Sequence, residues 1–246
     1  MKIKTDALVL GSFPFGESHK AVTLFTPEYG IMKGVAHGSR KPTSKFGSSM
    51  EMLNTVEVVI TLSKRNELHT IKEHTLKNSR HSLRGDADSM GYIFYLVEFL
   101  KEIFHEAPPN KSVYNLIINF IDNAPEGDSY LIHRALTIKI LKILGFIGEF
   151  DECAECGAES STFYISRYEG FIFCQECKKN TSDMQINAGT VQILKKLYHD
   201  SLKDITRLKI SEKQKYEIDE TVNTIIKGIL GKTLKSESYF YLNSSV

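Results

Sequence analysis

Short apolar segments in which hydrophobic and polar residues alternate occupy the first third of the chain. They are separated by glycine, proline, asparagine and serine, and the strongest turn signal lies at Pro27–Gly30. The apolar segments are Ala7–Leu10, Ala21–Phe25, Ile31–His37, Val56–Leu62 and Leu68–Ile71. Five short strands of this kind predict a small closed β-barrel.

The hydrophobic period changes after His81. Tyr92, Leu96, Phe99 and Ile103 recur at helical spacing in a stretch without proline, which predicts an amphipathic helix. Similar helical patterns cover residues 111–123, 128–146, 187–203 and 212–230. The fold class is therefore predicted to be α+β, with the strands first and most helices after them.

We predict four parts from these patterns. Residues 1–80 form the barrel, residues 81–150 and 181–246 form the two portions of a helical domain, and residues 151–180 form an insertion that carries the cysteines. Between the cysteine pairs, 162–166 and 170–173 have the pattern of a short β-hairpin.

Positive charge is concentrated in the predicted barrel. The net charge of the 246 residues is only +1, but residues 1–80 contain 12 lysines and arginines against 7 acidic residues. Residues 81–150 contain 6 against 9. If the protein has a polyanionic partner, the N-terminal part is the place where it is expected to bind.

No segment approaches the roughly 18 consecutive apolar residues of a membrane span, and the first residues lack the apolar stretch of a signal peptide. We therefore expect a cytoplasmic protein with no membrane contact. Because thiols stay reduced in that compartment, its four cysteines are expected to be metal ligands or redox groups instead of a disulfide framework.

The cysteines form two C-x2-C pairs, Cys153/Cys156 and Cys174/Cys177, with 17 residues between the pairs. A C-x2-C turn brings two thiolates to one ion, and two such turns complete the tetrahedron that zinc prefers. This spacing predicts one structural Zn²⁺ in a zinc ribbon, with no open position for catalysis. Unliganded thiols, a thiol–disulfide couple and an iron–sulfur cluster are the alternatives.

A basic segment without acidic residues, 33–45, begins in the third predicted strand and continues into the loop after it. Its basic residues are Lys33, His37, Arg40, Lys41 and Lys45, and glycine, serine and threonine lie between them. Such a segment can contact phosphates without reading sequence, and a solvated surface loop is the alternative interpretation.

Four aromatic residues of the predicted barrel, Phe13, Phe15, Tyr29 and Phe46, either stack on bases or fill the barrel. We expect most of them to fill it.

The sequence contains none of the common catalytic motifs. A phosphate-binding G-x-x-x-x-G-K-[ST], a G-x-G-x-x-G after a strand, a G-x-S-x-G and an H-E-x-x-H are all missing, so we expect no enzyme activity. Two classes of function fit the remaining features. One is a DNA-binding protein, and the other is a zinc-ribbon adaptor that acts mainly through protein–protein contacts.

The N-terminal segments resemble the RecO family of bacterial recombination proteins. The resemblance is carried by residues 7–10, 16–20, 24–30, 34–42 and 44–47, and it continues through the helical middle to the four cysteines. It implies an N-terminal five-stranded OB-type β-barrel, a helical domain with an embedded zinc ribbon, and a non-catalytic role in recombinational repair.

The resemblance also implies specific partners. RecO-like proteins bind single- and double-stranded DNA, anneal complementary strands, contact the C-terminal tail of single-strand-binding protein, and load recombinase together with RecR. By this resemblance, Arg40, Lys41 and Lys45 are the DNA-binding residues, Lys33 and His37 are their neighbours, and the protein is expected at the nucleoid in the cytoplasm.

Overall fold

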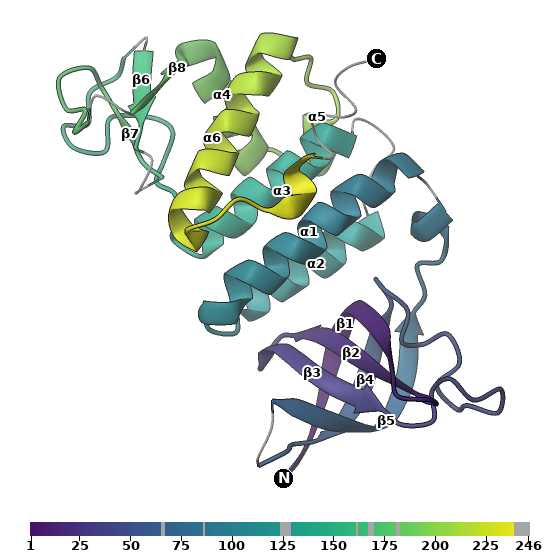
Figure 1. Ribbon diagram of the computed structural model, residues 1–246. Coiled ribbons are helices and arrows are strands. Elements are labelled where there is room, and N and C mark those ends of the chain that lie inside the picture. Colours follow the sequence, from purple (N-terminus) through teal and green to yellow (C-terminus); the bar gives the residue numbers. More distant parts are fainter. Residues whose placement is uncertain are drawn as a thin grey trace. The chain divides into compact units, whose positions relative to one another are not determined.

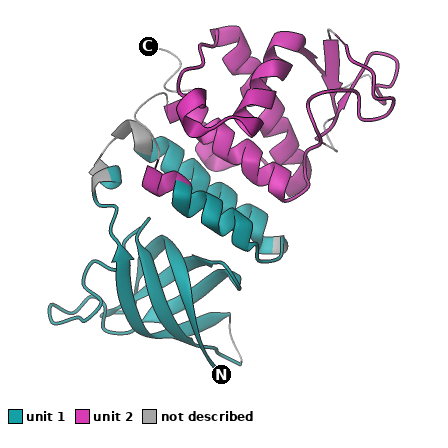
Figure 2. Ribbon diagram, turned by 180° about the vertical axis from the view of Figure 1, so that it is seen from behind, with its two compact units in different colours: residues 1–119 teal, residues 120–246 magenta. Residues whose placement is uncertain are grey.

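The structure is a computed structural model, and it describes residues 1–64, 67–85, 87–123, 129–160, 162–166, 170–180 and 183–238. The chain forms two compact units, Met1–Asn119 and Phe120–Val246 (Figure 2). The first unit contains the barrel, one helix and most of a second helix, and the second unit contains further helices and a small β-sheet.

A closed β-barrel forms the N-terminal part of the first unit (Figure 1). Its strands are β1 (Lys2–Phe15), β2 (His19–Thr26), β3 (Gly30–Ala36), β4 (Thr55–Thr61) and β5 (Leu68–Asn78). They neighbour one another in the order β1-β2-β3-β5-β4, and only the β3–β5 pair is parallel. The predicted five-stranded OB-type barrel is confirmed.

Where β1 pairs with β2, β1 contains one more residue than β2. Val9 pairs with Leu24 and Gly11 pairs with Thr23, so Leu10 has no partner in β2. Such a β-bulge reverses, from that point onward, which side chains of the strand face the barrel interior.

Beyond the bulge, the even-numbered side chains of β1 take the inward direction. Ser12 pairs with Val22, whose side chain belongs to the barrel core. Phe13 and Phe15 therefore lie on the outer face, where they are 60% and 45% exposed.

The long connection 37–54 between β3 and β4 supplies part of the barrel core. Phe46 and Met50 are 2% and 0% exposed and pack with the inward side chains of the strands. Phe46 also stacks on His74 of β5, with 4.8 Å between the ring centroids. Burial lowers the pKa of His74, and Lys45 lowers it further.

Helices follow the barrel, as predicted. A short 3-10 turn, η1 (Ser82–Gly85), leads into α1 (Ala87–Glu106) and α2 (Lys111–Asn123). These helices cover part of the outer barrel face, because Phe25 of β2 packs against Phe104 at 4.8 Å and against Tyr114 at 5.8 Å between ring centroids.

The second unit combines helices with a three-stranded sheet. Its elements are α3 (Ser129–Ile143), β6 (Thr162–Ile165), β7 (Ile172–Phe173), β8 (Met184–Asn187), α4 (Ala188–His199), α5 (Leu202–Ile205), α6 (Glu212–Leu230) and η2 (Lys235–Glu237). The predicted hairpin is present as β6 and β7, and β8 adds a third strand on the other side of β6.

Local sequence fixes the ends of α6. Ser211 accepts a hydrogen bond from the Gln214 backbone while the Gln214 side chain accepts one from the Ser211 backbone, which forms a capping box. Gly231 ends the helix in a left-handed conformation at φ 67°, which glycine adopts without steric cost.

A buried ion pair joins α3 to α6. Arg134 is completely buried, and its side chain contacts the Asp219 carboxylate at 2.7 and 2.8 Å. The Tyr130 hydroxyl donates a hydrogen bond of 2.8 Å to the same oxygen. Burial raises the pKa of Tyr130 above its usual range, so the hydroxyl remains a donor.

Among the helices that the structure describes, none is long and apolar enough to cross a membrane.

We predict that Asp219→Ala lowers the free energy of unfolding of the second unit by about 3–5 kcal/mol, because Arg134 would remain buried without its counter-charge. The double variant Arg134→Met/Asp219→Leu is expected to recover most of this loss. Urea unfolding followed by circular dichroism measures both. Equal destabilisation by the single and double variants would show that packing, not the unpaired charge, is responsible.

Candidate nucleic-acid interface and metal centre

Two tight turns present the four cysteines. In the first, the Gly157 amide donates to the Cys153 carbonyl at 2.9 Å, and in the second, the Cys177 and Lys178 amides donate to the Cys174 carbonyl at 3.2 and 3.1 Å. Each turn encloses the two intervening residues of a C-x2-C pair. Both thiols of a pair therefore project toward the same point.

Backbone contacts bring the two turns together. The Ala154 amide donates to the carbonyl of Ile172 in β7 at 2.9 Å, and Cys174 follows directly after β7. The hairpin also lies against the chain after α3, so closely that a side chain at Gly170 would overlap the Phe146 carbonyl. Only glycine fits there. The φ of 62° at this residue lies in the left-handed region, which also favours glycine.

The sulfur positions fit a tetrahedral metal ion. All four Sγ atoms lie within 4.8 Å of one another, and those of Cys156 and Cys174 are 3.8 Å apart. Sulfurs at about 2.3 Å from a zinc ion stand about 3.8 Å from each other in a regular tetrahedron. The donor set Cys153, Cys156, Cys174 and Cys177 is thus compatible with one structural metal ion.

The electrostatic surroundings differ between the thiols. Burial acts to raise the pKa of Cys153, but hydrogen bonds from the Cys174, Cys156 and Glu155 backbone outweigh it and hold the pKa at about 6. The neighbouring Cys156 and Cys174 thiols raise the pKa of Cys177. A metal cation removes this conflict, because it stabilises all four thiolates at once.

The two lysines that follow Cys177 lie against aromatic rings of the small sheet. The Lys178 ammonium lies 4.4 Å from the ring centroid of Tyr164, and that of Lys179 lies 5.2 Å from Phe173. Four thiolates around a divalent ion leave a net charge of −2, and two adjacent lysines offset it.

A second group of possible ligands, Glu149, Asp151 and His199, is exposed to solvent. Glu149 pairs with Lys142 at 2.6 Å and Asp151 pairs with Lys195. Surface ion pairs account for this group.

The five predicted DNA-binding residues all lie in the first unit, and all five side chains are exposed. Lys33 lies on β3, and His37, Arg40, Lys41 and Lys45 lie in the connection 37–54. The side-chain nitrogens of Lys33 and Lys41 have no hydrogen bond or ion pair with any residue that the structure describes. Both are therefore available to a phosphate.

Arg40 and Lys45 already have partners in the barrel. The Arg40 guanidinium donates to the carbonyls of Gly16 and Glu17 at 3.1 and 3.3 Å, in the β1–β2 turn. The Lys45 ammonium donates to the Lys72 carbonyl of β5 at 3.0 Å. These two side chains hold the connection 37–54 against the strands.

The β1–β2 turn and the connection also meet through two histidines. The Gly38 amide donates to Nδ1 of His19 at 2.9 Å, and the His19 and His37 rings are 4.7 Å apart. Nδ1 of His19 accepts this bond only when that nitrogen carries no hydrogen.

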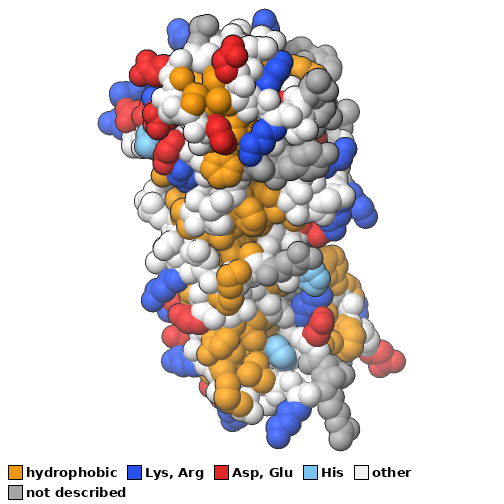
Figure 3. Space-filling view, turned by 90° about the vertical axis from the view of Figure 1, so that its left-hand side faces the viewer, with side chains coloured by type: hydrophobic (Ala, Val, Ile, Leu, Met, Phe, Trp, Pro, Cys, Tyr) orange, Lys and Arg blue, Asp and Glu red, His pale blue; other side chains and the backbone are white. Residues whose placement is uncertain are grey.

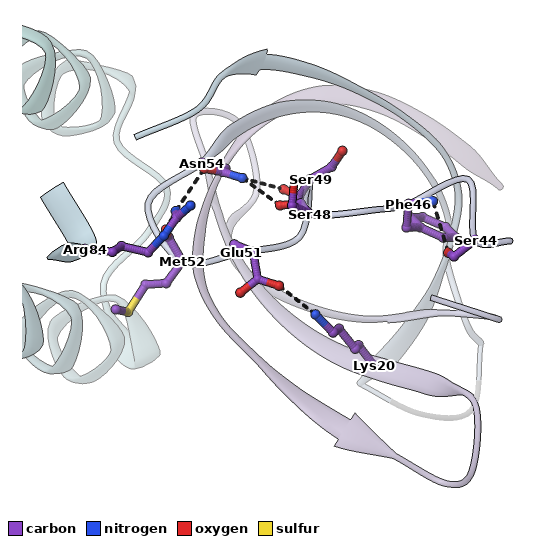
Figure 4. A network of polar contacts seen from close by, with 9 residues as sticks. All are labelled: Lys20, Ser44, Phe46, Ser48, Ser49, Glu51, Met52, Asn54 and Arg84. Atoms are coloured by element: carbon purple, nitrogen blue, oxygen red, sulfur yellow. Dashed lines mark hydrogen bonds and ion pairs between the residues drawn. The ribbon is translucent and has the colours of Figure 1, made fainter. Parts of the chain in front are cut away.

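Asn54 fixes the other end of the connection (Figure 4). Its side-chain amide donates to the carbonyls of Ser48 and Ser49 at 2.9 and 3.3 Å, and its Oδ1 accepts from Arg84 at 3.0 Å. The Arg80 amide also donates to Oδ1, at 3.3 Å. Asn54 is fully buried, so each of these bonds replaces water that it lost on folding.

The expectation that most of the four aromatic residues fill the barrel is wrong. Only Phe46 does, while Phe13, Phe15 and Tyr29 are exposed. The bulge in β1 turns the first two outward, and a one-residue insertion in a strand leaves no distinct signal in the sequence. Figure 3 shows hydrophobic side chains on the barrel surface, in the lower part of the view.

The fold and the cysteine cluster define a class of protein in which an OB-type barrel precedes a helical unit with a four-cysteine ribbon. The family model for the recombination protein O N terminal matches residues 1–80, and that for the recombination protein O C terminal matches residues 84–238. The chain belongs to the RecO family of DNA repair proteins.

Curated relatives cover nearly the whole chain. The DNA repair protein RecO of Desulforamulus reducens is 30% identical over 243 residues, which is 97% of this chain and 94% of that protein. The protein of the same name from Thermodesulfovibrio yellowstonii is 28% identical over 94% of each chain. That from Bacillus subtilis is 26% identical over 97% of this chain and 94% of its own.

We predict that Cys174→Ser removes the bound metal, because three thiolates and a hydroxyl bind zinc far more weakly than four thiolates. Mass spectrometry of the purified protein is expected to find about one zinc per chain before the change and almost none after it. Glu155→Ala, inside the first C-x2-C turn, is the control and keeps its metal. Equal metal content in the two variants would refute the four-cysteine site.

We also predict that Asn54→Ala destabilises the first unit by roughly 2–4 kcal/mol, because it removes several hydrogen bonds of a buried side chain. Glu51→Ala breaks only the partly exposed ion pair with Lys20 at 2.7 Å, and it is expected to cost less than about 1 kcal/mol. Thermal unfolding of both variants measures the difference, and similar costs would contradict the assigned role of Asn54.

Proposed function

We propose that this chain is a non-catalytic mediator of recombinational DNA repair. It binds single- and double-stranded DNA, anneals complementary strands, and helps to load recombinase onto single strands coated by single-strand-binding protein. Its protein partners are a RecR-like protein and the C-terminal tail of single-strand-binding protein, and it acts at the nucleoid in the cytoplasm. Membership of the RecO family over nearly the full chain is the observation that carries this proposal.

The DNA-binding role is proposed for the exposed basic residues of the barrel. Lys33 and Lys41 supply charges for phosphates, because their ammonium groups have no counter-charge within the described residues. Arg40 and Lys45 act mainly by holding the connection 37–54 in place. His37 lies between Lys33 and Arg40 in the sequence, and its ring contacts that of His19. The resulting contacts are independent of base sequence.

The proposed metal is one structural Zn²⁺, held by Cys153, Cys156, Cys174 and Cys177. When bound, it supplies folding energy to a small sheet and no reactive coordination position. The proposed domain division remains 1–80, 81–150, 151–180 and 181–246, with the ribbon as an insertion in the helical domain.

We predict that Lys33→Ala/Lys41→Ala weakens the binding of both single-stranded and duplex oligonucleotides, by roughly tenfold at low salt, because two phosphate contacts are lost. Fluorescence anisotropy across a salt series measures the affinity and the salt dependence, whose slope is expected to fall by about 2. Lys203→Ala/Lys213→Ala removes the same charge from exposed positions of the second unit and serves as the control.

Loss of affinity and slope in the barrel variant alone supports the proposal. Unchanged binding in that variant would refute the assignment of Lys33 and Lys41. Absence of DNA binding by the unaltered protein would refute the DNA-binding function and favour an adaptor that acts through protein contacts.

A further inference from the structure

The outer face of β1, β2 and β3 carries two exposed phenylalanines whose role the basic residues do not explain. The strand register places the side chains of this face in three rows across the strands. The rows are Phe15, His19 and His37; Phe13, Ala21 and Val35; and Gly11, Thr23 and Lys33. None of these nine positions is acidic.

Helix α1 reaches this face at Gly11, beside which the Lys101 ammonium lies, but it leaves Phe13 and Phe15 accessible. The next position along β2, Phe25, is buried under Phe104 and Tyr114 of α1 and α2, whereas Phe13 and Phe15 remain 60% and 45% exposed. Two neighbouring exposed rings cost hydrophobic free energy in the free protein. Such a patch is typical of a binding surface.

The charges around the rings favour a polyanion. The Lys101 ammonium lies 5.9 Å from the ring centroid of Phe13, and Lys33 lies in the adjoining row without a counter-charge among the described residues. Acidic residues near these rows include Glu17, in the β1–β2 turn, and Glu98, one helical turn before Lys101. Glu67 directly precedes Leu68, the β5 partner of Lys33. None of the three belongs to the rows.

Flat aromatic rings beside ammonium groups match the chemistry of single-stranded DNA. An unpaired base offers its π face for stacking, and its phosphates pair with the lysines. In a duplex the bases are stacked on each other, so the rings have no base face to contact, while the phosphates remain accessible.

We propose that Phe13 and Phe15 stack on unpaired bases and thereby make this barrel selective for single-stranded over duplex DNA. The inference rests on the proposed DNA-binding function and adds to it the residues that discriminate between the two forms of DNA. Lys33 and Lys41 contribute to the binding of both forms, and the phenylalanines contribute only to the binding of single strands.

The first test uses the absence of tryptophan from the sequence. Phe13→Trp and Phe15→Trp each introduce a single indole, whose fluorescence a stacked base quenches. We expect quenching on addition of an oligothymidine and much less with a hairpin duplex at equal saturation. Tyr29→Trp, at the opposite end of β2, is an exposed control and is expected to show no quenching. Equal quenching by both DNA forms, or none with bound oligothymidine, would overturn the inference.

The second test measures affinity by anisotropy. Phe13→Ala/Phe15→Ala is expected to lose roughly fivefold or more per ring for oligothymidine, and to bind duplex and an abasic strand as the unaltered protein does. Phe13→Tyr/Phe15→Tyr keeps the rings and is expected to retain the affinity, which separates stacking from a general disturbance of the hairpin.

The outcomes separate this inference from the function on which it rests. If the alanine variant binds every DNA form as the unaltered protein does, or loses affinity for all forms equally, the stacking role is wrong while DNA binding stands. If Lys33→Ala/Lys41→Ala also leaves binding unchanged, the basic-residue assignment fails separately. If the unaltered protein binds no DNA, both proposals fail.

Discussion

The unpaired residue Leu10 determines how strand β1 divides its side chains between the interior and the surface of the barrel. Leu10 has no partner in β2, and the alternation of the strand is therefore reversed beyond it. Inward positions before the bulge carry Val9, whereas Phe13 and Phe15 are turned outward after it. Part of the space inside is filled instead by Phe46, which the long connection 37–54 inserts into the barrel.

Different residues of the connection 37–54 fill the barrel interior and hold the connection against the strands. Phe46 packs inside the barrel, and Arg40 and Lys45 bind backbone carbonyls of neighbouring strands. Because these contacts hold the backbone, Lys41 remains exposed without having to stabilise the fold. A loop whose shape is set by buried and hydrogen-bonded residues presents its free charges at low entropic cost.

The second unit uses two different means of holding its elements. Its helices meet around a buried ion pair, Arg134 with Asp219, whose charges compensate each other away from water. The cysteine-bearing end of its small sheet has an apolar cluster of Cys153, Phe173 and Cys174. The proposed metal, held by the four thiolates, would add stability at this end.

The sequence by itself determined the features that depend on neighbouring residues. The C-x2-C spacing indicated a metal site because each pair acts within one turn, and hydrophobic periods indicated strands and helices because they reflect local geometry. Only the tertiary structure decided which partners meet over long distances, such as Arg134 and Asp219, and on which face Phe13 lies. A bulge or a distant pairing depends on how the whole chain packs, and no short segment encodes it.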